Sequence, residues 1–258
     1  MPDEIASPPI LTLSDFQNNP SSILPTLNNE NGALLLADKP YGVTSFSIVR
    51  NLKHLLQKYS GDKWVKVGHG GTLDPLATGL LILASRRATR YLHHLLGLEK
   101  TYWCELRLGI TTPSFDLETP IKIIEGGLGN LTKGNVEKTL RNFVGAQLQK
   151  PPIFSAVKLR GKPMYKHARK GREIEMTAKS ITIHSILDID ISIPYIRFRA
   201  DCSKGTYIRS LASDIGTSLE TGAVLTNLRR EKIGRWDVKD AMSFKMLEEL
   251  ETANTVKH

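Results

Sequence analysis

The order of expected strands and helices constrains the fold of this 258-residue chain most strongly. Apolar runs bounded by turn residues and period-two alternation predict strands, whereas apolar residues at helical spacing behind Ser or Thr caps predict helices. Strands are expected at residues 33–37, 63–67, 80–84, 101–108, 181–193, 195–202 and 228–233. Helices are expected at 44–59, 88–96, 133–144, 206–219 and 244–250, with Phe46, Val49, Leu52 and Leu56 on the inner face of the first. Because these elements lack a regular β-α-β order, we predict an α+β fold whose mixed, largely antiparallel central sheet is flanked by helices and loops.

Several function classes are disfavoured by what the sequence lacks. It contains neither a G-x-x-x-x-G-K-[ST] phosphate loop nor a G-x-G-x-x-G motif, so ATP and dinucleotides are poor candidates. Its two cysteines, Cys104 and Cys202, form no C-x-x-C pair, and we expect two buried thiols with no metal and no disulfide. No apolar run approaches the roughly 18 to 20 residues of a membrane span, and the N-terminus does not resemble a secretory signal. We therefore expect a cytoplasmic protein without a cofactor.

Positive charge is concentrated in one short segment. The chain carries a formal net charge of +9, and the segment 158–172 holds seven cationic residues and no acid. A solvated helix face would usually mix both signs, whereas a phosphate backbone requires a concentrated basic patch. The segment therefore predicts binding of a phosphate backbone, chiefly through Lys158, Lys162, Lys166, Arg169, Lys170 and Arg172.

One carboxylate stands out by its surroundings. Asp74 follows a glycine-bearing loop, and Pro75 comes directly after it. Asp-Pro is a common helix entry, which predicts a single helical turn at residues 75–78 that ends at Gly79. The positive end of such a helix would keep the carboxylate charged, as a carboxylate nucleophile must be. The alternative is an ordinary capping residue after a glycine turn.

Three other residues carry weaker signals of chemistry. Arg209 is one position from the core stripe of the helix expected at 206–219, and a guanidinium buried there needs an anion, for which Asp74 is a candidate. The alternative is an exposed arginine at the helix edge. Tyr102 lies in an alternating strand, where most tyrosines are core or rim residues. His69 precedes two glycines and is expected in a loop.

Taken together, these residues fall in ordered sequence blocks that resemble the TruB family of tRNA pseudouridine synthases. The resemblance runs from about residue 32 to residue 240. The blocks are K-P-Y-G-V-T-S at 39–45, G-H-G-G-T-L-D-P-L-A-T-G-L-L at 68–81, K-T-Y at 100–102, P-P-I-F-S-A-V-K at 151–158, C-S-K-G-T-Y-I-R at 202–209 and the stretch 228–234.

The resemblance implies a role for each matching position. Asp74 corresponds to the catalytic aspartate, Arg209 to the arginine paired with it, and Tyr102 to the tyrosine that stacks on the target base. His69 corresponds to the histidine that enters the T loop when the uridine leaves, and Arg90 to a cation near the RNA. Residues implied to support the active site are Lys39, Pro40, Tyr207 and Leu228.

The resemblance also implies a reaction: isomerisation of uridine 55 in the T loop of tRNA, by base flipping and an aspartate nucleophile, in a monomer without metal. Residues 1–31 are expected to form an irregular extension, 32–240 the catalytic domain, and 241–258 a short helix or tail without a PUA domain. Residues 111–116 depart from the family's T-D-T-x-D pattern, although Asp116 is kept. Whether the aspartate attacks uracil C6 or acts at the ribose stays open. Two alternatives are a tRNA-folding chaperone with incidental catalysis and a guide-RNA-dependent ribonucleoprotein subunit.

Overall fold

The computed structural model describes residues 7–154, 158–159, 162–163 and 177–255. The chain divides into two compact units, the first formed by residues 1–100 with 229–258 and the second by residues 101–228. The boundary falls within strand β13 (Ala223–Ile233), which contributes residues to both units. Each unit is described separately below.

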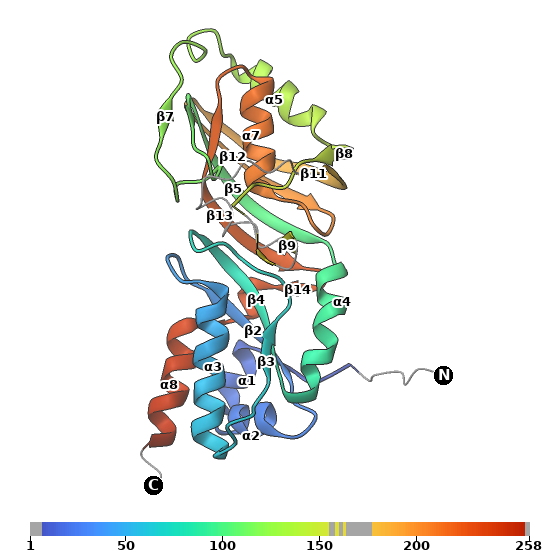
Figure 1. Ribbon diagram of the computed structural model, residues 1–258, viewed down its shortest axis with the longest axis vertical. Coiled ribbons are helices and arrows are strands. Elements are labelled where there is room, and N and C mark those ends of the chain that lie inside the picture. Colours follow the sequence, from blue (N-terminus) through green and yellow to red (C-terminus); the bar gives the residue numbers. More distant parts are fainter. Residues whose placement is uncertain (1–6, 155–157, 160–161, 164–176, 256–258) are drawn as a thin grey trace, which may run out of the picture. The chain divides into compact units, whose positions relative to one another are not determined.

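The first unit is built around a mixed sheet whose main strand order is β1-β2-β4-β13 (Figure 1). Strand β2 runs antiparallel to β4, from Leu34 opposite Ala84 to Lys39 opposite Gly79. Strands β1 and β15 run parallel to β2, whereas β3 and β14 pair antiparallel with β4 and β13. The strand bounds are β1 Ile10–Leu11, β2 Leu34–Lys39, β3 Val67–His69, β4 Ala77–Ser85, β14 Trp236–Asp237 and β15 Met242–Ser243.

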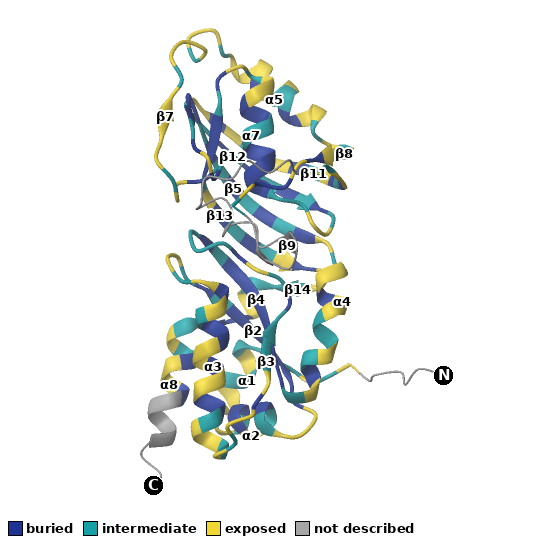
Figure 2. Ribbon diagram, in the orientation of Figure 1, coloured by how far each residue is buried: buried dark blue, intermediate teal, exposed yellow. Residues whose placement is uncertain are grey.

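Both faces of this sheet are covered, and the central strands are therefore apolar throughout. Alternate residues of β2 and β4 enter two separate hydrophobic clusters: Leu35 and Leu81 belong to the first, and Leu36 and Ile82 to the second. Helices α2, α3 and α8 contribute to the first cluster and α4 to the second, so the buried strands are dark blue in Figure 2. The helix bounds are α1 Leu13–Asn18, η1 Pro20–Ser22, α2 Ile23–Asn28, α3 Ser45–Ser60, η2 Arg86–Tyr91, α4 Leu92–Gly97, η3 Val238–Asp240 and α8 Phe244–Thr255.

The N-terminal segment is more ordered than the sequence analysis expected. Residues 10–28, which were expected to be irregular, form β1, α1, η1 and α2. The Asp15 carboxylate accepts the Thr12 backbone N–H at 2.8 Å, and Ile23, Leu24 and Leu27 are almost fully buried. Proline and asparagine separate these short helices, and burial of their few apolar residues holds them in place. Helices this short need such tertiary packing to be stable.

The second unit has a sheet in the order β13-β5-β12-β11-β8. Strand β11 pairs antiparallel with β8 on one side and with β12 on the other, and α5 packs against β11 and α7. Alternate residues of β5 are buried from Lys100 to Leu108, as the period-two pattern predicted. The bounds are β5 Lys100–Leu108, β6 Ile110–Thr111, β7 Lys122–Ile123, α5 Lys133–Asn142, β8 Gly145–Gln149, β9 Lys158–Leu159, β10 Lys162–Pro163, β11 Lys179–Ser192, β12 Tyr195–Cys202 and α7 Ile208–Ser218.

Most of the long elements are confirmed, with four differences. The strand expected at 63–67 is mainly a loop, and the short strand β3 begins only at Val67. Helix α3 has its predicted cap, because the Thr44 hydroxyl accepts the Ser47 N–H, but Phe46 is exposed and Ile48 and Leu55 are buried in its place. The helix expected at 88–96 is a 3₁₀ helix followed by a short α-helix, and β8 was not predicted. Both cysteines are buried, as expected, Cys104 in β5 and Cys202 in β12. None of the described helices combines the length and the apolar character needed to cross a membrane.

Candidate functional site

Asp74 lies in a β-turn and not at the start of a helix. The Ala77 N–H donates to the Asp74 carbonyl oxygen at 3.1 Å, and strand β4 begins at Ala77. The helical turn expected at 75–78 is therefore wrong, and the expected dipole of a helix starting at Asp74 is not present. Asp followed by Pro fits the first two positions of a type I turn as well as it fits a helix entry, and the apolar run after it favours a strand.

The glycine after this turn is required by close packing. Gly79 has φ of +106°, and an added Cβ would lie 2.3 Å from the carbonyl oxygen of Arg230 on β13. The sequence analysis attributed Gly79 to a helix break, whereas its reason is the approach of two backbones in the first unit. A side chain at this position would push β4, and with it the Asp74 turn, away from β13.

A buried hydroxyl fixes the residue before Asp74. The Ser45 hydroxyl, at the first position of α3, donates to the Leu73 carbonyl at 3.0 Å and accepts the Leu73 N–H at 2.9 Å. Ser45 and Leu73 are 2% and 3% exposed. Both backbone polar groups of Leu73 are thus satisfied by one side chain, which ties the start of α3 to the Asp74 turn.

A buried ammonium ties the loop after β2 to the same turn. Lys39 is fully buried, and its Nζ donates to the carbonyls of Pro40, Val43 and Pro75 at 2.9, 2.6 and 3.2 Å. The Gly42 N–H also donates to the Pro75 carbonyl, at 2.9 Å. Burial lowers the pKa of Lys39 to about 8, and the negative charge of Asp74 opposes this shift. The Lys39–Pro75 contact therefore joins residues 36 positions apart next to Asp74.

Arg230 supports the glycine loop from the other side, and the sequence analysis assigned it no role. Its side chain is 2% exposed and donates to the carbonyls of Leu80 at 2.7 Å, Gly71 at 3.0 Å and Thr72 at 3.4 Å. The available signal was its position: it shares the inward face of β13 with Leu228. A cation on an inward face needs polar partners, and here these are backbone carbonyls.

His69 is the last residue of β3, opposite Leu83 of β4, and not in a loop as expected. Its Nδ1 accepts the Gly71 N–H at 3.3 Å. Burial and then the Arg230 cation lower the pKa of His69, which favours the neutral ring. The His69 ring is therefore bonded to the glycine segment that leads from β3 to Asp74, and Nδ1 is the acceptor.

The second unit holds the other two residues expected to act in catalysis. Tyr102 lies on the inner face of β5 and is 9% exposed. Arg209, at the second position of α7, is 4% exposed, so the alternative of an exposed arginine is wrong. Its guanidinium donates to the carbonyls of Ser114 at 3.0 Å and Phe154 at 2.9 Å, and its Nε lies 3.6 Å from the Asp116 carboxylate. The pairing of Arg209 with Asp74 stays a prediction.

The contact with Arg209 gives a structural reason for an aspartate at position 116, in a segment that otherwise differs from the family pattern. Asp116 is 4% exposed, and its backbone carbonyl accepts bonds from Thr112 and Ser114. The sequence analysis noted that Asp116 is kept in the segment 111–116 but did not connect it with Arg209. In the second unit this loop receives the guanidinium, so it fixes the position of that side chain.

The remaining predicted residues fall in four groups. The Tyr207 backbone exchanges two hydrogen bonds with the Gln149 side chain, at 2.8 and 3.1 Å, and Leu228 is 8% exposed. Arg90 is exposed in η2. The backbones of Lys158 and Lys162 belong to the hairpin β9–β10. Four of the expected RNA-binding residues lie outside the described residues: Lys166, Arg169, Lys170 and Arg172. Within the described part of the chain, no three His, Cys, Asp or Glu side chains are grouped to hold a metal ion.

A family model for the TruB family pseudouridylate synthase (N terminal domain) matches residues 55–208. The chain therefore belongs to the TruB family of pseudouridylate synthases, which are isomerases, and the resemblance seen in the sequence is confirmed. It is 46% identical over 219 residues to the tRNA pseudouridine synthase B of Flavobacterium johnsoniae, covering 84% of this chain and 95% of the relative. It is 40% identical over 225 residues to the protein of the same name from Clostridium kluyveri, covering 87% and 74%.

Solved structures support the same fold. The chain matches a protein in a Cbf5-Nop10-Gar1 complex with a TM-score of 0.61 and 28% identity, over 82% of this chain and 52% of that one. It matches one in an archaeal box H/ACA sRNP Nop10-Cbf5 complex with a TM-score of 0.61 and 26% identity, over 88% and 54%. The chain thus spans about half the length of these structural relatives, and the predicted α+β fold is confirmed.

Proposed function

We propose that this protein isomerises uridine to pseudouridine in tRNA, at position 55 of the T loop, with Asp74 as the nucleophile. The curated relatives at 40–46% identity carry the name tRNA pseudouridine synthase B, which supports tRNA as the substrate. The observation that carries the role of Asp74 is the triple support of its turn. A buried hydroxyl, a buried ammonium and a buried guanidinium each bond the backbone within three residues of this carboxylate.

Such support matches what the reaction demands of a carboxylate. The N1–C1′ bond of the nucleotide breaks, a C5–C1′ bond forms, C5 loses a proton and N1 gains one, so the exchange needs no redox partner. A nucleophile held rigidly at one position gains rate because the entropy of orientation is removed before the reaction. Asp74 attacks either uracil C6 or the ribose, and the chemistry of a single carboxylate is compatible with both.

The remaining roles follow from reach and chemistry. The target base must leave the stack, at a cost of a few kcal/mol. Stacking on Tyr102 would return roughly 1–3 kcal/mol of this cost. Arg209 is proposed to pair with Asp74 and keep it ionised, and His69 to occupy the space that the base vacates. A neutral imidazole suits insertion among bases, since a cation would have to shed its hydration.

The test is tritium release from a T stem-loop RNA labelled at C5 of uridine, using the purified chain alone. Wild type should release tritium only from position 55, and Asp74→Asn should release none while binding the RNA normally. Asp190→Asn, which changes an exposed carboxylate of the second unit, is the matched control and should retain full activity. Turnover by Asp74→Asn would contradict the nucleophile, and inactivity of the wild type without a guide RNA would favour the ribonucleoprotein alternative.

A further inference from the structure

The most exposed large apolar side chain among the described residues belongs to Trp64, which is 88% exposed. It lies in the loop 61–66 between α3 and β3, and its neighbour Val65 is 1% exposed. Burial of Val65 directs the preceding side chain outward. An indole is among the largest apolar groups a protein can bury, and this one is held on an ordered loop where a partner can reach it.

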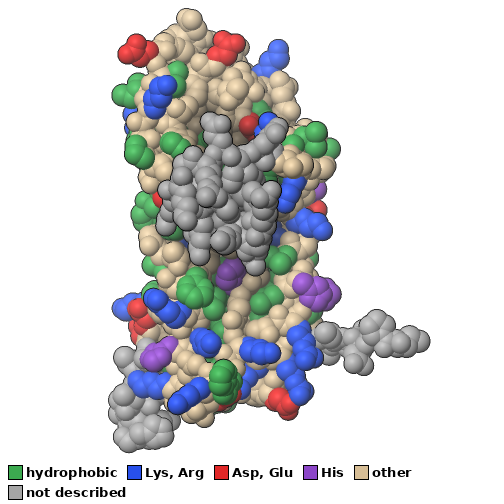
Figure 3. Space-filling model, viewed as in Figure 1, with side chains coloured by type: hydrophobic (Ala, Val, Ile, Leu, Met, Phe, Trp, Pro, Cys, Tyr) green, Lys and Arg blue, Asp and Glu red, His purple; other side chains and the backbone are tan. Residues whose placement is uncertain are grey.

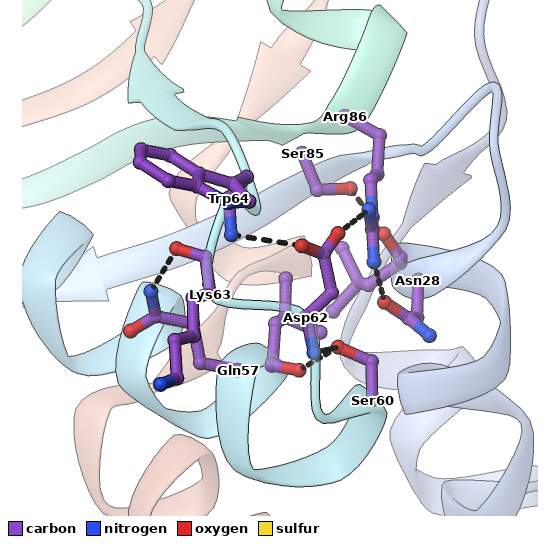
Figure 4. A network of polar contacts seen from close by, with 10 residues as sticks. Asn28, Gln57, Ser60, Asp62, Lys63, Trp64, Ser85 and Arg86 are labelled. Carbon is purple, nitrogen blue, oxygen red and sulfur yellow. Dashed lines mark hydrogen bonds and ion pairs between the residues drawn. The ribbon is translucent and has the colours of Figure 1, made fainter.

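A polar network fixes the backbone that carries this indole (Figure 4). One oxygen of the Asp62 carboxylate accepts the backbone N–H of Trp64 at 2.8 Å, and the other oxygen pairs with the Arg86 guanidinium. Arg86 also donates to the Asn28 side chain, so the pair is anchored at the end of α2. In Figure 4 the indole and the Arg86 side chain lie on opposite sides of the Asp62 carboxylate.

The residues on both sides of Trp64 are held as well. The Gln57 side chain donates to the Lys63 carbonyl at 2.7 Å, and the Arg86 N–H donates to the Lys66 carbonyl at 2.8 Å. Gly61 ends α3 in the left-handed conformation that starts this loop. Exposure of the indole is therefore a consequence of well-bonded backbone, and a preorganised side chain loses little entropy when it binds.

The surroundings of Trp64 favour a polyanion. Lys63 and Lys66 are both exposed, whereas the nearest acid, Asp62, is engaged with Arg86. Residues 40–98 contain only two acids, Asp62 and Asp74, against eight cations: Arg50, Lys53, Lys58, Lys63, Lys66, Arg86, Arg87 and Arg90. The face of the first unit in Figure 3 shows the same excess of Lys and Arg over acidic side chains.

We propose that Trp64, Lys63 and Lys66 form a second RNA contact, in which the indole stacks on an unpaired base and the two ammonium groups bind the flanking phosphates. Aromatic side chains between cations are the usual means of holding unpaired nucleotides. The inference rests on the proposed function for the identity of the RNA, and it adds a binding site outside the catalytic loop. A second copy of the chain is a poor occupant, because two proteins of charge +9 repel each other at this basic surface.

The number of residues between Trp64 and His69 limits the distance between the proposed RNA contact and the Asp74 loop. Trp64 is five residues before His69, so the two Cα atoms are at most about 17 Å apart. A bound nucleotide could thus come from the stem-loop that His69 is proposed to enter, or from the tRNA beyond it.

The experiment measures the Kd of Trp64→Ala, Trp64→Phe and the wild type for the isolated T stem-loop and for full-length tRNA. We expect Trp64→Ala to weaken binding about 5- to 150-fold for at least one RNA, and Trp64→Phe to recover most of the loss. Joint replacement of Lys63 and Lys66 by alanine should reduce the slope of log Kd against log salt by about 1 to 2. Ile123→Ala, which truncates a 72% exposed side chain on β7, is the matched control and should leave the Kd unchanged.

The outcomes separate this site from the proposed function. Loss of affinity for both RNAs locates the nucleotide in the stem-loop, and loss for full-length tRNA alone locates it outside. Unchanged affinity of Trp64→Ala for both RNAs, in a preparation that still forms pseudouridine, overturns the site. So does a change in oligomeric state on sedimentation without a change in RNA affinity. A wild type that binds tRNA through Trp64 but forms no pseudouridine would instead overturn the proposed function.

Discussion

Replacement of Ser45 by alanine tests whether rigid support of the Asp74 turn matters for catalysis. The change removes one oxygen atom that satisfies both backbone groups of Leu73, at 3.0 and 2.9 Å. Leu73 is 3% exposed, so water does not readily replace the lost partner. The perturbation is small in volume and acts one residue before the proposed nucleophile.

The magnitude follows from the two groups left without partners. An unsatisfied buried backbone donor or acceptor costs about 1–3 kcal/mol, so two of them cost about 2–6 kcal/mol. Alanine recovers a few tenths of a kcal/mol through its higher helix propensity in α3. We expect a net loss of about 1.5–5.5 kcal/mol in the free energy of unfolding, measured by urea denaturation.

The activity readout needs a control that loses stability in the same way at another place. Ser85 is such a residue, because its buried hydroxyl donates to the Leu27 carbonyl at 2.6 Å and accepts the Ala33 N–H at 3.2 Å. Ser45→Ala should lower kcat by about 10- to 100-fold, since a misplacement of 1 Å can cost that much. Ser85→Ala should lose similar stability and keep kcat within about twofold of the wild type, because it contacts no part of the turn.

Two results would refute the reasoning. Equal losses of kcat in both variants would mean that activity follows general stability and not the position of the turn. A change in the free energy of unfolding below about 0.5 kcal/mol for Ser45→Ala would mean that the Leu73 groups find other partners.

Two further predictions concern the buried cations around the turn. The pKa of Lys39 falls from 10.5 to about 8, so between these values the native state binds fewer protons than the unfolded state. The free energy of unfolding of the wild type should therefore rise with pH from about 8 to 10.5 relative to Lys39→Met, and the two curves should run parallel below pH 8; a difference independent of pH throughout would contradict the shift. Arg230→Met removes a cation that lowers the pKa of His69, so NMR titration of the ring should give a higher pKa than in the wild type. Arg229→Met is the control, since that arginine pairs with Asp38 at 2.7 Å, and an equal shift in both variants would exclude a specific effect of Arg230.

Local sequence patterns predicted the helices and strands in which buried and exposed side chains recur at a regular spacing. The period-two alternation of β5, the cap and length of α3, and the long hairpin of β11 and β12 follow from side chains a few residues apart. The pattern failed at the Asp-Pro step, because a β-turn and a helix entry use the same two residues. What decided between them was the pairing of the following residues with β2.

The candidate site was predictable in part. The ordered sequence blocks indicated that Asp74, Arg209, Tyr102 and Lys39 belong to one active site. They could not indicate that the Lys39 ammonium bonds three backbone carbonyls, or that Arg209 approaches Asp116. A carbonyl acceptor leaves no trace in the sequence, because every residue has one.

The sequence by itself determined the family, the mixed sheet with its two-sided apolar strands, and the charge that favours a nucleic-acid partner. Only the tertiary structure decided which side chains hold the Asp74 turn, why Gly79 must lack a Cβ, and that the Trp64 indole is presented outward on bonded backbone. The physical reason is range: hydrophobic periodicity acts between near neighbours, whereas the Ser45 and Arg230 contacts of the Asp74 turn join residues 28 to 159 positions apart. The Trp64 loop is anchored through the Asp62–Arg86 pair, 24 positions apart, and the Gly79 contact depends on how closely two strands approach.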